Sequence, residues 1–356
     1  MSEKMAGDPS VFQETFQSIV QQNIDDFEME REEAVTDALQ QLVAQGVDTR
    51  FIVADERAGD VPTLIAELAA LAAEPEPERL CDADTERSQL PAVCALLRHM
   101  TLDDDVRVPY GRAHEHARQL VAEHGLLDAL LELLKGAVDE PALSAELIHT
   151  CTKLCVRQEF CEQFAGGGGL HTLLETMRRS PSHTALVGRA FFLIRTLAGC
   201  DKVKRAIMDE GAAEVITAAL DTLKAKVLVC ESAFAAIGAL TLRSQENAAA
   251  LAAADAIPVI VAAMELHLGE PKTQKLACMA VRNMVSRSPE LRPVFRELNI
   301  EQLINQVLQA HGPKVDAEAR AALRDLDCQV TLKEEWTGRG GALTTGRITE
   351  PERPDA

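Results

Sequence analysis

Three histidines and two cysteines are the residues whose types and spacing come nearest to a metal site in this chain. His114, His116 and His124 lie on one helical segment, but residues two apart on a helix point to different sides, and no cysteine or carboxylate stands at a matching spacing. Cys151 and Cys155 are one helical turn apart and lack a second pair of ligands. A solvated helix face and small buried side chains explain the two groups better, so we predict no metal ion and no cofactor.

A run of four glycines, Gly166 to Gly169, is a second candidate, because glycine-rich loops can cradle phosphate groups. The run is not followed by the Lys-Ser or Lys-Thr pair of a nucleotide-binding loop, and no strand precedes it. A turn between two helices that needs positive φ is the better explanation. No Ser-His-Asp or Cys-His set is anchored at a recognisable turn, and we therefore expect a protein that is not an enzyme.

The composition favours packed helices. Apolar residues make up 47% of the 356 residues, yet aromatic residues make up only 3%, with one Trp and one Tyr. A core of Ala, Leu, Val and Ile fits close-packed helices better than a β-sandwich or barrel, which would use more aromatic and β-branched residues.

Charge and cysteine content narrow the compartment and the partners. The 36 basic and 56 acidic residues give a net charge of -20, which disfavours nonspecific binding to nucleic acid. Nine scattered cysteines do not form a disulfide framework, so a reducing compartment is expected. The N-terminus, with Glu3 and Asp8, lacks a signal-peptide pattern, and the most apolar stretch, 248–264, is interrupted by Asp255 and Pro258. We expect a soluble monomer of the cytoplasm, and of the nucleus as a second location, with no nucleic-acid or membrane partner.

One segment recurs along the chain. Five stretches of similar pattern begin at intervals of 43, 43, 44 and 44 residues, at Gly125, Gly168, Gly211, Asp255 and Asn299. Each unit adds two further segments of helical periodicity, a short one before the recurring stretch and a longer one after it. A triplet of helices with this period is typical of an all-α, right-handed solenoid, and the short first helix favours armadillo repeats.

The flanks of the array are less regular. We divide the chain into an N-terminal helical extension (1–60), a degenerate first repeat with an acidic insertion (61–124), the repeat array (125–336) and a disordered tail (337–356). Within these parts we expect two cap helices at 11–30 and 31–45, second and third helices at 61–73 and 84–100, and an exposed loop at 101–112.

Motifs at both ends resemble one known family. Gln13 to Phe16, Asn23 to Phe27, Glu32 to Val35 and Gln45 to Asp48 are similar to the N-terminal extension of the sixth armadillo-repeat-containing protein family. Ala322 to Leu326, then Cys328, Val330, Leu332 and Glu335 to Gly338, resemble the way that family ends. The resemblance covers nearly the whole chain and implies an armadillo scaffold, and it leaves the activity open.

Armadillo proteins that bind extended peptides line a groove with their third helices, where a Trp is followed four residues later by an Asn. The resemblance places these paired positions at His149 and Lys153, Phe192 and Thr196, Ala235 and Ala239, Met279 and Asn283, and Ala321 and Asp325. Only Asn283 matches, and no Trp occupies any of the positions. This departure argues against recognition of a basic nuclear-import peptide.

Arginines recur on the same helix face. Four residues beyond the Asn column stand Arg157, Cys200, Arg243 and Arg287, and one residue before it stand Thr152, Arg195, Gly238, Arg282 and Arg324. The third helices, taken as 142–157, 184–198, 224–243 and 271–287, carry 11 basic and 2 acidic residues. One Arg per repeat would meet about every third residue of an extended acidic partner. An Arg at the end of a helix also complements the helix dipole, so both explanations stay open.

We therefore predict a protein-interaction scaffold whose basic concave groove binds an extended acidic or phosphorylated segment of a protein or peptide partner. The predicted partner-binding residues are Arg157, Arg195, Arg243, Arg282, Asn283 and Arg287. The alternative is an adaptor of the nuclear-transport type that binds basic cargo peptides through acidic patches.

Overall fold

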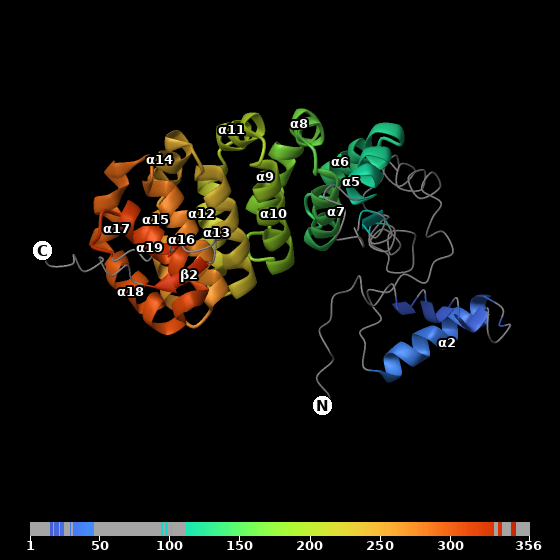
Figure 1. The fold of residues 1–356 in the computed structure, drawn as a ribbon. Coiled ribbons are helices and arrows are strands. Elements are labelled where there is room, and N and C mark those ends of the chain that lie inside the picture. Colours follow the sequence, from blue (N-terminus) through green and yellow to red (C-terminus); the bar gives the residue numbers. More distant parts are fainter. Residues whose placement is uncertain are drawn as a thin grey trace, which may run out of the picture. The chain divides into compact units, whose positions relative to one another are not determined.

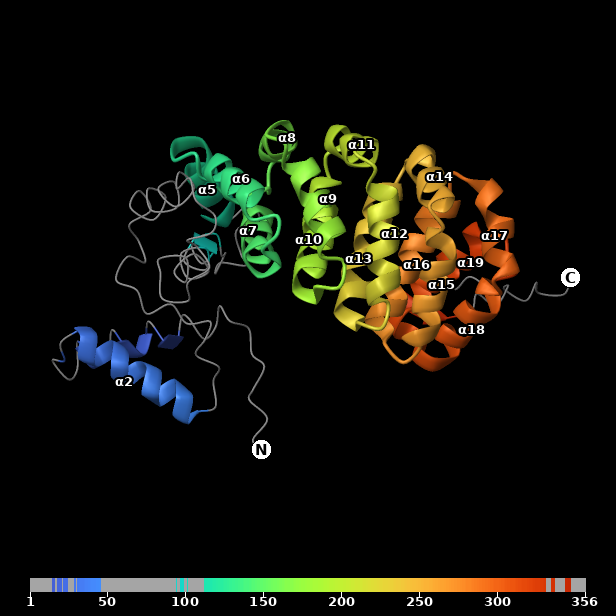
Figure 2. The ribbon, with the colours of Figure 1, turned by 180° about the vertical axis from the view of Figure 1, so that it is seen from behind.

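The computed structural model describes residues 112–330 without interruption, together with residues 31–45 and the segments 334–336 and 343–346. It also describes the separate positions 15, 16, 18–20, 22–24, 29, 94, 97, 98 and 101. The chain divides into two compact units, unit 1 (residues 1–210) and unit 2 (residues 211–356). Figures 1 and 2 show their ribbons from opposite sides.

Unit 1 contains two complete helix triplets and the first helix of a third (Figure 1). The first triplet is α5 (Arg112–Arg118), which continues into the π-helical turn η4 (Gln119–Glu123), then α6 (Leu126–Gly136) and α7 (Pro141–Leu154). The second is α8 (Gln158–Gly166), α9 (Gly169–Arg179) and α10 (Thr184–Leu197), and it is followed by α11 (Asp201–Asp209).

Unit 2 continues the same order of helices (Figure 2). It begins with α12 (Ala212–Leu223) and α13 (Val227–Thr241), followed by the triplet α14 (Gln245–Ala253), α15 (Ala256–Leu266) and α16 (Pro271–Val285). The last triplet comprises the 3-10 turn η5 (Pro289–Leu291) with α17 (Arg292–Glu297), then α18 (Ile300–His311), and η6 (Gly312–Lys314) with α19 (Asp316–Asp325). The three-helix repeat predicted from the period is confirmed.

The recurring position that sets the period is a sharp corner before each second helix. Its φ is 66° at Gly125, 83° at Gly168, 76° at Gly211, 59° at Asp255 and 55° at Asn299. Left-handed backbone costs most residues free energy, whereas Gly adopts it readily and Asp and Asn tolerate it best among the others. The positive-φ turn expected in the glycine run is thus confirmed.

The core of each unit is built from aliphatic side chains and a few phenylalanines. Phe164 and Phe191 in unit 1, and Phe234 and Phe295 in unit 2, are fully buried. The third helices pack side by side, α7 with α10 in unit 1, and α13 with α16 and α16 with α19 in unit 2. Burial of one Leu or Phe side chain contributes roughly 1.5–3 kcal/mol. Neighbouring triplets therefore stabilise each other through a shared core.

Two histidines join successive repeats in unit 2 at equivalent corners. The Nε2 atom of His267, just after α15, lies 2.7 Å from the carbonyl oxygen of Lys224, and Nε2 of His311, at the end of α18, lies 2.7 Å from that of Leu268. Each pair spans 43 residues, so the hydrogen bond repeats with the period of the array.

Helix α2 (Arg31–Ala44) of unit 1 belongs to a small apolar cluster of its own. Its buried Ala34, Ala38 and Leu42 pack with Phe16 and Val20. The side-chain amide of Asn23 donates hydrogen bonds to the carbonyl oxygen of Ala34 at 3.3 Å and to Asp37 at 3.0 Å. The expected helix at 61–73 and most of the expected acidic loop at 101–112 lie outside the described residues.

Two short strands follow the helical repeats in the C-terminal segment. Strand β1 (Glu334–Trp336) pairs with β2 (Leu343–Gly346) as a two-stranded antiparallel sheet. Glu334 stands opposite Gly346, and Trp336 stands opposite Leu343. Trp and Thr favour extended backbone, so these short segments have a local preference for strand. The many glycines of the tail make this preference hard to see in the sequence.

Among the helices of the described chain, no single one is long and apolar enough to cross a membrane. The consecutive helices α14 and α15 pass that test together on length and composition, with an 80° bend between them. Asp255, with positive φ, stands at this bend.

Candidate partner-binding faces on the third helices

The third helices end earlier than the sequence indicated, which changes the place of three predicted binding residues. Arg157 is the N-cap of α8, with φ of -121°. Arg243 follows the end of α13 with φ of 61°, and Arg287 stands two residues beyond α16. The equivalents of Arg157 are Cys200, Ser244 and Ser288, the N-caps of α11, α14 and η5. The column of arginines is therefore corrected: only Arg243 and Arg287 share a structural position.

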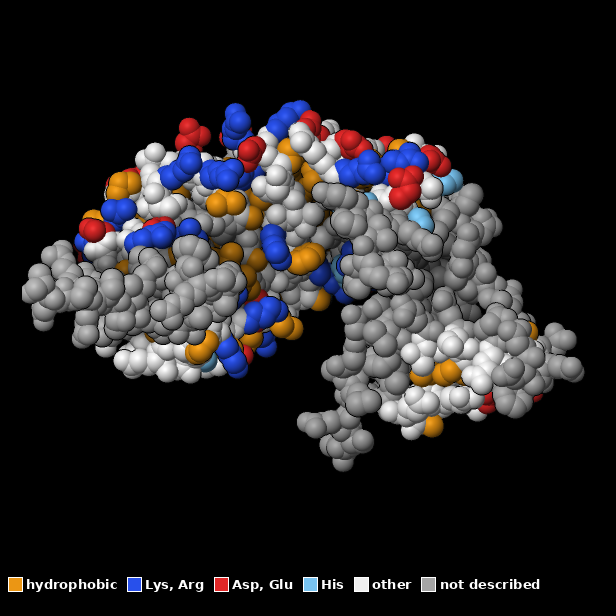
Figure 3. All heavy atoms as spheres, in the orientation of Figure 1, with side chains coloured by type: hydrophobic (Ala, Val, Ile, Leu, Met, Phe, Trp, Pro, Cys, Tyr) orange, Lys and Arg blue, Asp and Glu red, His pale blue; other side chains and the backbone are white. Residues whose placement is uncertain are grey.

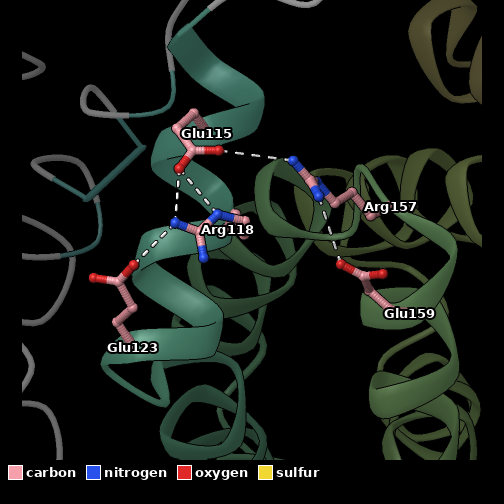
Figure 4. A network of polar contacts seen from close by, with 5 residues as sticks. All are labelled: Glu115, Arg118, Glu123, Arg157 and Glu159. Carbon is pink, nitrogen blue, oxygen red and sulfur yellow. Dashed lines mark hydrogen bonds and ion pairs between the residues drawn. The ribbon is translucent and has the colours of Figure 1, made fainter.

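Arg157 lies in a network of ion pairs at the edge of unit 1 (Figure 4). Its guanidinium is 3.8 Å from a carboxylate oxygen of Glu115 and 3.7 Å from one of Glu159. Glu115 also accepts from Arg118 at 2.7 Å, and Arg118 reaches Glu123 at 3.0 Å. The hydrogen bond from Arg118 lowers the pKa of Glu115. Because carboxylates from two helices surround it, Arg157 presents little uncompensated charge to a partner.

A charged group spans the third helices of unit 1. Glu146 on α7 forms ion pairs with Arg98 at 2.8 Å and with Arg189 on α10. One turn along, burial lowers the pKa of His149 to about 3, and the neighbouring charges of Arg98, Arg189 and Lys153 act in the same direction. His149 is therefore neutral near pH 7, and its buried Nδ1 has no hydrogen-bond partner. Two arginines thus share the carboxylate of Glu146 on this face.

Phe192 and Arg195 form the second exposed feature of unit 1. The Phe192 ring is 43% exposed on α10, and the Arg195 guanidinium carbon lies 5.8 Å from the ring centroid. Such a cation-π contact holds the guanidinium in place while leaving its N–H groups available to an acceptor. No carboxylate of the described chain lies within ion-pair distance of Arg195.

In unit 2, ion pairs cross between neighbouring third helices. Lys272 on α16 lies 2.7 Å from Glu231 on α13, and Lys275 lies 3.1 Å from Glu318 on α19. Arg282 lies 3.4 Å from Asp325, which Arg324 also approaches to 2.7 Å. These contacts engage most of the charge counted on α16, including that of the predicted site residue Arg282.

Ion pairs between neighbouring third helices have a sequence signal that charge counts along single helices missed, namely opposite charges separated by one repeat. Glu146 and Arg189, Lys275 and Glu318, and Arg282 and Asp325 are each 43 residues apart. A search for opposite charges at that period would have found these three pairs. It would have removed Arg282 from the cations free to meet a partner.

Asn283 is engaged within the fold. Its side-chain amide donates a hydrogen bond to the carbonyl oxygen of Gly238 on α13 at 2.9 Å. Gly238 lies close to the backbone of α16, because a Cβ placed on it would be 3.8 Å from the Cα of Ala280. The amide thus ties α16 to α13, although sequence comparison gave it a peptide-binding position.

Arg243 and Arg287 remain exposed at the ends of α13 and α16. Within the part of the chain that the structure describes, no carboxylate lies in ion-pair distance of either residue. The α13 helix itself contains no Lys or Arg, and it exposes Leu228 near its start, with Leu242 exposed just beyond its end. On the side of the molecule drawn in Figure 3, basic (blue) and apolar (orange) side chains of the described residues lie next to one another.

The predicted site residues divide between the units. Arg157 and Arg195 belong to unit 1, and Arg243, Arg282, Asn283 and Arg287 belong to unit 2. The histidines and cysteines weighed as metal ligands do not form a cluster: no three His, Cys, Asp or Glu side chains of the described chain gather to hold a metal. Cys151 is buried, and burial raises the pKa of its thiol.

Two family models match this chain. The ARMC6 model matches residues 84–345, and the model of the armadillo repeat-containing protein 6 N-terminal domain matches residues 10–72. The armadillo repeat-containing protein 6 homolog of Drosophila melanogaster is 40% identical over 244 residues, which are 68% of this chain and 52% of that protein. Armadillo repeat-containing protein 6 of Homo sapiens is 37% identical over 258 residues, 70% of this chain and 51% of that protein. The chain spans about half the length of these curated relatives.

Solved structures with the same fold include designed armadillo repeat proteins. One, solved in complex with the peptide (KR)4, has a TM-score of 0.59 at 17% identity and covers 75% of this chain and 100% of its own. Another, designed computationally for modular peptide recognition, has a TM-score of 0.58 at 19% identity and covers 74% and 99%. These likenesses show the armadillo repeat fold.

Proposed function

The chain belongs to the armadillo repeat-containing protein 6 family, and on that premise we propose that it is a non-catalytic scaffold whose third-helix faces bind an acidic or phosphorylated segment of a protein partner. The proposal concerns the repeat units described above. Its main anchors are Arg243 and Arg287 in unit 2, with Arg195 as the anchor in unit 1.

The observation that carries the proposal is that no carboxylate of the described residues lies within ion-pair distance of these arginines, on a protein of net charge -20. Other basic residues on the same helices, such as Lys272 and Lys275, are paired with carboxylates. Three exposed guanidinium groups that are not neutralised by a carboxylate of the described residues supply donors in the planar arrangement that carboxylates and phosphates accept. The helix dipole alone would explain single arginines at helix ends, and it does not explain the cation held against Phe192 in the last turn of α10.

The second candidate is a basic peptide partner, and one observation favours testing it. A structural neighbour of this fold was solved with the basic peptide (KR)4. In this chain the only Asn of the expected ladder donates to Gly238, and the acidic residues Glu146, Glu231 and Asp325 are engaged by cations. Repulsion from Arg243 and Arg287 would oppose a basic segment on unit 2.

The test measures peptide binding by fluorescence anisotropy with the full chain. The probes are a Glu-Ser peptide and a Lys-Ser peptide of about 10 residues, enough to cross three neighbouring third helices. We expect the acidic probe to bind, and to lose affinity by about tenfold or more in Arg243→Glu/Arg287→Glu, while binding weakens with added salt. Preferential binding of the basic probe would establish the second candidate, and no effect of the reversal on acidic binding would refute the assignment of the anchors.

A further inference from the structure

An apolar stripe runs along the exposed side of α13 in unit 2. Leu228 is 74% exposed and Leu242 is 48% exposed. Ser232, Ala235 and Ala239 lie between them at helical spacing and are half-buried. We call these five residues the α13 stripe. Its two leucines leave apolar surface in contact with water, which favours burial against a partner.

A row of basic residues lies directly beside this stripe. The contacts of Glu231 with Lys272 and of Gly238 with Asn283 place α16 alongside α13 over most of its length. On the exposed side of α16, Met279 is 40% exposed and the Arg282 side chain is 45% exposed. Arg243 and Arg287 stand beyond the ends of the two helices. The surface is therefore apolar along α13, and Arg243 and Arg287 stand at the C-terminal ends of α13 and α16.

From this arrangement we infer that unit 2 docks an amphipathic partner helix, apolar on one side and acidic on the adjacent side, which lies lengthwise along the α13 stripe. The inference rests on the proposed function, because it assumes an acidic partner. It adds the conformation and the apolar side of that partner.

The length of the stripe selects a helix over an extended segment. Leu228 and Leu242 are 14 residues apart, which corresponds to about 21 Å along a helix axis. An extended segment that crosses the third helices from one repeat to the next would meet one of these leucines and leave the other exposed. A helix of about four turns parallel to α13 covers both, and its apolar residues recur at the spacing of three and four that such a face requires.

Charge complementarity fixes the chemistry of the other side of the partner. The only acidic residue of α13, Glu231, has a side chain that is 11% exposed and is held by Lys272. Beyond it, the described residues at the C-terminal end of this surface include Arg243, Arg282, Arg287 and Arg324, with Asp325 shared by two of them. Carboxylates along the adjacent side of a bound helix, concentrated toward that end, would meet Arg243 and Arg287, whereas Arg282 and Arg324 are paired with Asp325.

The experiment compares three labelled peptides on the full chain by fluorescence anisotropy. The first is a helix-forming peptide of about 14 residues in which Leu falls on one face and Glu on the adjacent face. The second has the same composition with the leucines spread around the helix. The third is the Glu-Ser peptide used above. The second peptide keeps charge and helix propensity constant, so the comparison isolates the apolar face.

The variant Leu228→Ser/Leu242→Ser removes the stripe, and Leu266→Ser is the matched control because Leu266 is 58% exposed at the end of α15 in the same unit. We expect the native chain and the control to bind the first peptide at least about tenfold tighter than the second. The double variant should bind the two peptides with equal affinity. Both leucines are solvent-exposed, so helix content by circular dichroism should match that of the native chain.

Equal binding of the first two peptides by the native chain would overturn the inference, as would a difference between them that persists in the double variant. Binding of the Glu-Ser peptide that is lost in Arg243→Glu/Arg287→Glu would then leave the proposed function standing without the helix. Failure of all three peptides to bind would refute the two proposals together.

Discussion

Replacing Gly125 by alanine tests whether the left-handed backbone at the corner before a second helix explains why glycine recurs there with the period of the array. Gly125 has φ of 66°, and a Cβ placed on it would meet no heavy atom within 4 Å. The cost of the substitution is therefore conformational alone. Left-handed backbone disfavours an L-residue by about 1–2 kcal/mol, and the stiffer unfolded chain returns about 0.4–1 kcal/mol of this. We expect a net loss of about 1 kcal/mol in the stability of the first triplet.

Gly136 provides a matched control at the other end of the same helix, α6. It too has open space around its Cβ position, and its φ is not positive. Gly136→Ala should leave stability unchanged or raise it by about 0.5–1 kcal/mol, because alanine is the better helix former. Amide hydrogen exchange of α6 peptides by mass spectrometry compares the two. About 1 kcal/mol corresponds to roughly fivefold faster exchange through opening in Gly125→Ala, and equal exchange in the two variants would refute the assignment.

Two further predictions concern His149 and Asn283. The pKa of His149 in the folded chain is about 3, below its ordinary value of 6.5, so the unfolded chain takes up the proton first as pH falls. Stability is then complete above about pH 6.5 and declines toward pH 3, by about 1 kcal/mol between pH 7 and pH 5 after allowance for partial exposure. The urea midpoint of the native chain should fall over this interval more than that of His149→Gln, and identical pH dependence in both would contradict the burial of a neutral imidazole. Asn283→Ala should lower stability by about 1 kcal/mol through loss of the bond to Gly238, while the affinity for the Glu-Ser probe stays unchanged. A large loss of peptide affinity with native stability would instead mean that the amide contacts the partner.

The fold could be predicted from the sequence because its determinant is local. Gly125, Gly168 and Gly211, with Asp255 and Asn299 in their place later in the chain, are the residue types that best tolerate the left-handed corner, and their even spacing reveals the repeat. Helix periodicity then supplies the two other helices of each triplet. Every one of these features depends on residues within about one helix of each other.

The ends of the third helices could not be predicted from the local sequence, because they depend on contacts with other elements. Arg243 adopts positive φ although its type does not favour it, and Arg157 stands at the start of α8 against Glu115 of α5. The sequence pattern therefore predicted both arginines to lie on third helices, although in the structure these helices end before them. The pairing of Arg282 with Asp325 arises from the stacking of successive repeats, so charge counts along one helix overstated the free positive charge.

Some of the candidate face was nevertheless accessible to sequence reasoning. Arg195, Arg243 and Arg287 lie at exposed positions on or just beyond third helices. The apolar stripe was not foreseen, because Leu228 and Leu242 look like core residues in a helix as apolar as α13. Only the packed structure distinguishes its buried face from its exposed one.

The most direct test of the central claim is the affinity of the full chain for the Glu-Ser peptide before and after charge reversal of Arg243 and Arg287, which lie beyond ion-pair distance of every carboxylate in the described residues. Arg243→Glu/Arg287→Glu is compared with Lys135→Glu/Arg205→Glu, which makes the same change in net charge at exposed positions on α6 and α11. A third-helix binding face predicts a loss of about tenfold or more in the first variant and little change in the second. Equal losses in both variants would show that net charge, and not this face, attracts the peptide, and would contradict the account.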